Sequence, residues 1–163
     1  MNKDKLSIVA LVVLSVVLHG ALMPHLTVFG GRLNLLIAVV AGVALYHGTW
    51  VGMLIGLCTG LLADIVLGHA LGLSAVPLVL IGFFTGQLER RVYRDAFLVP
   101  VFVGLSASAA FEVVVLLLSR LAFGTWWRRA FIATAIPTIL INGAFMPLVF
   151  WFLGRVLPNN KEV

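Results

Sequence analysis

Residues 48–72 read GTWVGMLIGLCTGLLADIVLGHALG, with small or acidic residues at every fourth position. The series is Gly48, Gly52, Gly56, Gly60 and Asp64, followed by Gly68 and Gly72. Residues four apart share one face of a helix, and glycine on that face lets another helix backbone approach closely. We therefore interpret the series as far as Asp64 as a surface that packs against another span or a partner's helix, and we call its glycines, Gly48, Gly52, Gly56 and Gly60, the glycine ladder. Gly68 and Gly72 are expected in the turn that follows.

The composition around this stretch is that of an integral membrane protein. Of 163 residues, 62% are hydrophobic and 10% are charged, and the mean hydropathy is +1.15. Soluble globular domains are far more polar. The apolar runs lack the short alternating pattern of membrane strands, so the fold class is predicted to be all-α.

The spans follow from the apolar runs and the turn residues between them. No charged residue occurs over residues 33–63, and one helix there would be about 46 Å long, well beyond a hydrocarbon core of about 30 Å. We interpret this region as a compressed hairpin that turns over residues 46–50. The whole chain is predicted to be one six-span transmembrane domain, with spans at residues 6–23, 33–46, 51–67, 73–87, 97–119 and 130–153.

The basic residues predict an orientation. With six spans, one side of the membrane carries Lys3, Lys5, Arg90, Arg91, Arg94, Arg155 and Lys161, whereas the other carries Arg32, Arg120, Arg128 and Arg129. Basic residues accumulate in cytoplasmic loops, so both termini are expected in the cytoplasm. The net charge of +5 is assigned to this topological role and not to nucleic-acid binding.

Asp64 and Glu112 are the two acids inside predicted spans, where a charge costs about 2.5–3.5 kcal/mol on insertion scales. Asp64 is interpreted either as an ion, proton or partner contact, or as a helix end that is wet or caps the next turn. Glu112 lies deeper, and either forms a functional polar site or is a protonated, hydrogen-bonded acid. Its candidate partners are Asn142, His19, Ser106 and Ser108.

No arrangement of residues typical of a catalytic site was found. The chain lacks a phosphate-binding loop, a zinc-protease helix, a nucleophile elbow and the paired aspartates of an intramembrane protease. Four scattered histidines and the single Cys58 predict neither a metal site nor a cofactor. We therefore expect a non-enzymatic protein.

The run from Gly60 to Ala75 resembles a family pattern, G-L-x-x-D-x-x-x-G-x-x-L-G-x-x-A, at every fixed position. That pattern is typical of the bacterial rod shape-determining protein MreD family. The chain length, the short loops and the basic segment after the fourth span are also similar. Asn34 is a departure, because relatives often carry a proline and an acid near that position.

The resemblance implies a non-enzymatic component of the elongasome in the bacterial inner membrane, supporting side-wall peptidoglycan synthesis and rod shape. The implied partners are MreC, which has a single span, the glycan polymerase and transpeptidase, and the MreB filament. The family is also similar in fold to the substrate-binding subunits of energy-coupling-factor transporters. A rival hypothesis is therefore capture of a small, vitamin-like solute at Glu112 and Asn142.

Overall fold

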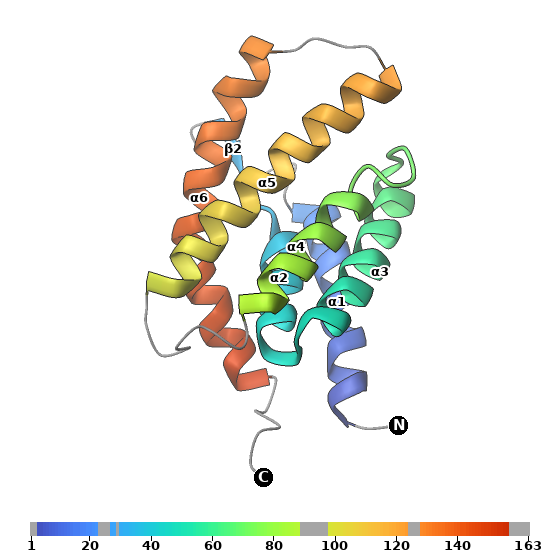
Figure 1. Ribbon diagram of the computed structural model, residues 1–163, viewed down its shortest axis with the longest axis vertical. Helices are drawn as coiled ribbons and strands as arrows, with labels where there is room; N and C mark the ends of the chain where they lie inside the picture. The colour runs from blue at the N-terminus through green and yellow to red at the C-terminus, as the bar shows by residue number, and fades with distance from the viewer. Residues whose placement is uncertain (1–2, 23–26, 29, 89–97, 124–127, 157–163) are drawn as a thin grey trace.

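The computed structural model describes residues 3–22, 27–28, 30–88, 98–123 and 128–156. These residues form six helices and one short antiparallel strand pair (Figure 1). The elements are α1 (Lys3–Leu22), β1 (Thr27–Val28), β2 (Gly31–Arg32), α2 (Leu35–His47), α3 (Thr49–Leu67), α4 (Ala75–Leu88), α5 (Leu98–Phe123) and α6 (Arg128–Val156). The predicted all-helical class is confirmed, since the strands pair over only two residues each. The strand pair itself was not predicted.

Helix α2 is the centre of the bundle. It contacts each of the other five helices, and Leu36 to Leu45 are all buried. Figure 1 shows α6 on one side of the molecule and α1 and α3 on the other, with α2 and α4 between them. A helix surrounded in this way can be apolar on every side, because every side faces protein.

Two local devices set the ends of α2. The side chain of Asn34 caps its first turn by accepting a hydrogen bond from the Leu36 N–H at 3.1 Å. Its last turn closes with the N–H of Gly48, which donates to the Ala44 carbonyl at 2.8 Å. Gly48 has a φ of 83° and is the only residue between α2 and α3. The predicted hairpin over residues 33–63 is therefore present, but its turn is one residue and not the five from 46 to 50.

Three helices are long and apolar enough to cross a membrane: Thr49–Leu67, Leu98–Ala122 and Ala133–Arg155. The other apolar helices are shorter, over Ser7–Ala21, Leu35–His47 and Ala75–Leu88. At about 1.5 Å per residue, α2 is about 20 Å long, less than the thickness of a hydrocarbon core. Six helices lie close to the predicted ranges, while six membrane crossings and a single domain remain predictions.

The burial pattern of the long helices also indicates a membrane. Large apolar side chains point outward, including Ile65, Phe102 and Leu140, each more than 60% exposed. Polar side chains such as Asp64, Ser108 and Asn142 are buried inside the bundle. Hydrocarbon outside the protein accounts for this distribution, because it accepts apolar surface without cost and penalises exposed polar groups.

Candidate functional site

Glycines on α3 and α4 let the two backbones come into contact along most of their length. A Cβ on Gly52 would lie 2.7 Å from the Gly82 carbonyl oxygen, and a Cβ on Gly56 would lie 2.7 Å from the carbonyl carbon of Leu78. At the far end, a Cβ on Gly60 would overlap the Cα of Ala75. Any side chain larger than hydrogen at these positions would push the helices apart.

The same pairing continues where α2 joins α3. A Cβ on Gly86 would lie 2.5 Å from the Cα of Thr49 and 2.8 Å from the carbonyl carbon of Gly48. Gly52, Gly56 and Gly60 on α3 and the pair Gly82 and Gly86 on α4 therefore face each other in antiparallel register. The sequence predicted the small-residue face of α3, and the structure shows that α4 packs against it.

The α4 backbone thus occupies the groove formed by the glycine ladder. The opposite face of α3 carries exposed apolar side chains, among them Leu54, Leu57, Leu61 and Ile65. A partner's helix therefore has access to this outward face of α3, whereas the ladder is used inside the chain. Partner binding by the ladder itself stays a prediction.

Asp64 is fully buried at the end of α3 and holds the turn into α4. Its Oδ2 accepts a hydrogen bond from the Gly72 N–H at 2.8 Å, and its Oδ1 accepts from the Ser74 N–H at 3.0 Å. Its backbone carbonyl accepts from the N–H groups of Gly68 and His69. Asp64 is thus the acceptor that caps the turn, and it is not a wet helix end.

The position of Asp64 also explains how a buried carboxylate is stabilised. Gly72 and Ser74 immediately precede α4, and their carbonyl groups accept from the N–H groups of Val76 and Leu78 in its first turn. The partial positive charge of a helix N-terminus favours an anion at this place. The carboxylate is therefore paired with backbone dipoles in place of water.

Gly68 and Gly72 let the chain reverse at this turn. Their φ values are 69° and 97°, and a Cβ on either residue would meet no atom within 4 Å. The requirement for glycine is therefore conformational and not steric, in contrast to Gly52, Gly56 and Gly60. This distinguishes the two kinds of glycine that the sequence showed as one series.

We expect Gly68→Ala to lower the free energy of unfolding by about 1 kcal/mol, because the left-handed region disfavours side chains by about that amount. Gly68→Asn should cost less, since asparagine adopts this conformation more readily. Thermal unfolding of the purified protein in one detergent would compare the two variants. Equal losses for both would contradict a conformational cause.

A second polar cluster joins β2, α5 and α6. The Asn34 N–H donates to Asn142 Oδ1 at 2.7 Å, and the Arg32 N–H donates to Thr138 Oγ1 at 3.0 Å. Gly31 permits this contact, because a Cβ there would lie 2.6 Å from the backbone of Pro137 and Thr138. The cluster fixes the segment before α2 against the middle of α6.

Glu112 lies on the α5 face that packs against α6. On the same face, a Cβ on Gly104 would lie 2.8 Å from the Cβ of Met146 on α6, and Ser108 is fully buried. The half-buried carboxyl of Glu112 interacts electrostatically with the guanidinium of Arg32. Arg32 was not predicted as a neighbour of Glu112, because no periodicity in the sequence relates a loop residue to a distant helix.

The other polar atoms of this cluster differ in how they are bonded. Ser108 Oγ and Asn142 Nδ2 are buried without a hydrogen-bond partner among the residues that the structure describes. Ser106, a predicted neighbour of Glu112, instead donates to the carbonyl of Phe102 in its own helix at 2.8 Å.

His19, another predicted neighbour of Glu112, lies on α1 and interacts electrostatically with His69 in the α3–α4 turn. Within the described ranges, no three residues of the metal-binding types come together.

We expect Asn142→Ala to leave the half-buried Asn34 N–H without its acceptor and to destabilise the protein by about 1 kcal/mol, the net contribution of a typical hydrogen bond. Hydrogen exchange over residues 31–36 should accelerate, since Asn34 also caps α2. Ser106→Ala is the control, because that hydroxyl bonds only within α5. Unchanged exchange in Asn142→Ala would show that the bond does not fix this segment.

The turn geometry gives a physical role to most positions of the family pattern. Gly60 admits Ala75, Asp64 accepts from Gly72 and Ser74, and Gly68 ends α3 in the left-handed conformation. Leu71 is an exception, because its side chain is 71% exposed at the turn. The pattern is therefore largely a description of one tightly packed helical hairpin.

Comparison with known proteins agrees with this geometry. A family model described as "rod shape-determining protein MreD" matches residues 3–158. No curated protein and no solved structure matches the chain. The similarity in fold to energy-coupling-factor subunits therefore stays a prediction. Because the family model covers nearly all of the 163 residues and includes the α3–α4 hairpin, the chain belongs to the MreD family of rod shape-determining proteins.

Proposed function

We propose that this chain is a non-enzymatic scaffold of the cell-elongation machinery in the bacterial inner membrane. Membership of the MreD family supports a role in rod shape determination. In this proposal the chain binds MreC and supports side-wall peptidoglycan synthesis by the glycan polymerase and transpeptidase, together with MreB filaments. The observation that carries the proposal is the α3–α4 hairpin, a rigid unit built from the positions of the family pattern.

The outward face of α3 is the surface that we assign to a partner's span. Its inward face is filled by α4, while Leu57, Leu61 and Ile65 remain exposed on the other side. Helices associate in membranes by van der Waals packing, so a straight, well-fixed helix is a suitable docking surface. The glycine ladder would then act indirectly, by fixing the position of α3.

Both ends of the described chain support the proposed orientation. The start of α1 and the end of α6 lie at the same end of the molecule (Figure 1). An even number of crossings gives this arrangement, and the bias of basic residues favours the cytoplasm for that end. Trp151 stacks under the guanidinium of Arg155 at 3.8 Å near this end, a pairing suited to the headgroup region.

The test is affinity purification of the tagged chain from its native membrane in mild detergent, followed by identification of the copurifying proteins. Recovery of MreC and the wall synthases is expected. Leu61→Ala and Ile65→Ala remove exposed side chains, and should reduce MreC recovery without lowering thermal stability. Val113→Ala on α5 is a matched control, because that side chain is also exposed but lies on another helix. Absence of MreC from every preparation would overturn the proposal.

Solute capture is the second candidate, and one observation favours it. Asn142 Nδ2 is a buried donor without a hydrogen-bond partner among the described residues. A bound solute would raise the apparent stability by mass action. A panel of vitamins should then raise the melting temperature of the protein, and Glu112→Ala should abolish that effect. A flat response to the panel, or recovery of MreC without ATPase subunits, would count against solute capture.

A further inference from the structure

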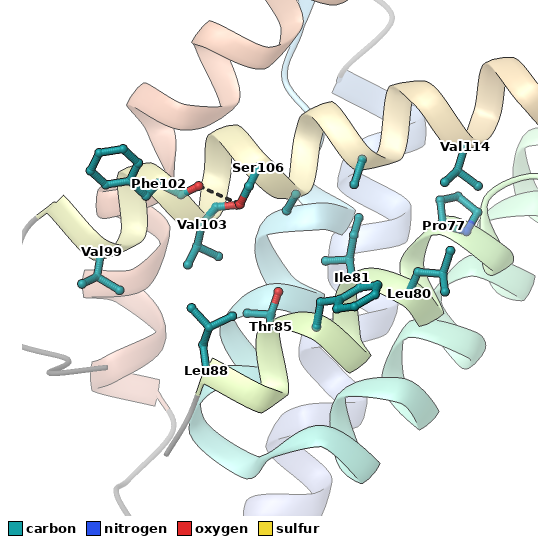
Figure 2. A pocket seen from close by; sticks show the side chains of 13 residues that line it. Pro77, Leu80, Ile81, Thr85, Leu88, Val99, Phe102, Val103, Ser106 and Val114 are labelled. Carbon is teal, nitrogen blue, oxygen red and sulfur yellow. Dashed lines mark hydrogen bonds between the residues drawn. The ribbon is translucent and has the colours of Figure 1, made fainter. Parts of the chain in front are cut away.

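A groove with a volume of about 600 Å³ runs between α4 and α5 (Figure 2). Leu80 and Phe84 line it on α4, and Phe102 and Ala110 line it on α5. Glycines let α3 pack closely against α4, and Gly104 lets α5 pack closely against α6. No glycine is among the described residues that line the groove. The groove therefore lies between two closely packed helix pairs.

The groove lies at the depth of the membrane. On α5 its lining extends from Val99 to Val114, within the segment that is long and apolar enough to cross a bilayer. At about 1.5 Å per residue this stretch is about 22 Å long. Phe84 and Phe102 are 60% and 67% exposed, so hydrocarbon and not water is the medium around the groove.

The chemistry of the walls indicates an occupant that forms no hydrogen bonds. The described lining residues include two hydroxyl side chains, Thr85 and Ser106, and no charged group. Ser106 already donates to the Phe102 carbonyl at 2.8 Å. A polar ligand would lose its own hydrogen bonds on entering such a site without replacing them.

The size of the groove also limits the occupant. A volume of about 600 Å³ falls within the ~300–1,000 Å³ typical of small-molecule sites.

We propose that the groove between α4 and α5 binds an acyl chain of a membrane lipid. A flexible hydrocarbon chain fills an irregular apolar space, requires no hydrogen bond and is the most abundant component of the surrounding medium. The bound chain acts as a wedge that keeps the α3–α4 pair separate from the α5–α6 pair. This inference is independent of which protein partners the chain binds.

The experiment uses the full-length protein in nanodiscs of phosphatidylethanolamine and phosphatidylglycerol that carry a photoreactive diazirine on one acyl chain. After irradiation, mass spectrometry of peptides maps the labelled residues. Labelling is expected to be several-fold higher at the groove lining, such as Ala110, than at Leu57 and Ile65, which are exposed on α3 and contact bulk lipid. Labelling no higher than on α3 would overturn the proposal.

Ala110→Phe should fill the groove and reduce both labelling there and the lipid retained in native mass spectrometry. Val113→Phe is the matched control on the same helix, since Val113 is exposed and does not line the groove. Retention that is equal in the two variants would contradict the proposal. The mapping in the unmodified protein tests it even if Ala110→Phe fails to fold. Recovery of a copurified protein helix crosslinked in the groove, in place of lipid, would also overturn it.

Discussion

Replacing Asp64 by alanine is expected to produce the largest loss of stability of any single polar substitution in the α3–α4 hairpin. The carboxylate is fully buried and accepts from the N–H groups of both Gly72 and Ser74. Hydrogen bonds to a charged group contribute about 1.5–3 kcal/mol each. Alanine would leave both donors unpaired, the Ser74 N–H in the interior and the Gly72 N–H half-buried. We expect a loss of roughly 3 kcal/mol or more, measured by thermal or denaturant unfolding in detergent.

Asp64→Asn provides the control for this prediction. Asparagine keeps the shape of the side chain and one acceptor oxygen, but places an amide N–H₂ where the second oxygen accepts a backbone hydrogen bond. Its stability should therefore fall between those of the wild type and Asp64→Ala. Ion or proton binding by Asp64 would give a different result, in which both variants unfold like the wild type but lose function.

Gly60→Ala is expected to have an effect of similar size for a steric reason. A single added methyl group would overlap the Cα of Ala75 and lie 2.7 Å from its backbone nitrogen. Neither atom can move without displacing the first turn of α4. Overpacking of this kind costs about 1–3 kcal/mol, and more where the contact is backbone against backbone. Thermal unfolding and the ability of the variant to restore rod shape in cells would measure the loss.

Cys58→Leu is the matched control on the same helix. Cys58 lies two residues from Gly60 but is exposed on the outward side of α3, so a larger side chain there enters the membrane. Its stability should stay close to that of the wild type. If Gly60→Ala were as stable as Cys58→Leu, close approach of α3 and α4 would not be needed for the fold.

Several features were predictable because they depend on neighbouring residues in one chain segment. Long apolar runs predicted the helices, and the basic residues and turn signals separated them to within a few residues of Lys3–Leu22, Leu35–His47 and Leu98–Phe123. The four-residue glycine spacing predicted a close-packing face on α3. The acid at position 64 was correctly recognised as unusual, although its two interpretations could not be separated.

The features that were missed depend on residues far apart in the chain. Nothing local relates Arg32 to Glu112, or Asn34 to Asn142, because these contacts join the segment before α2 to α5 and α6. The strand pair of Thr27–Val28 with Gly31–Arg32 is too short to leave a periodic pattern. The buried position of α2 was also hidden, since a helix inside a bundle and a helix in lipid are equally apolar.

The amino-acid sequence alone was enough to recognise a helical membrane protein similar to the MreD family, with a small-residue packing face that ends at one acid. These properties follow from composition and short-range periodicity, which act within single elements. The three-dimensional arrangement was needed to see that α4 fills the glycine ladder, that Asp64 accepts from the turn N–H groups, and that a groove separates α4 from α5. Such properties depend on which helix faces meet, and many arrangements of six apolar helices share the same hydropathy.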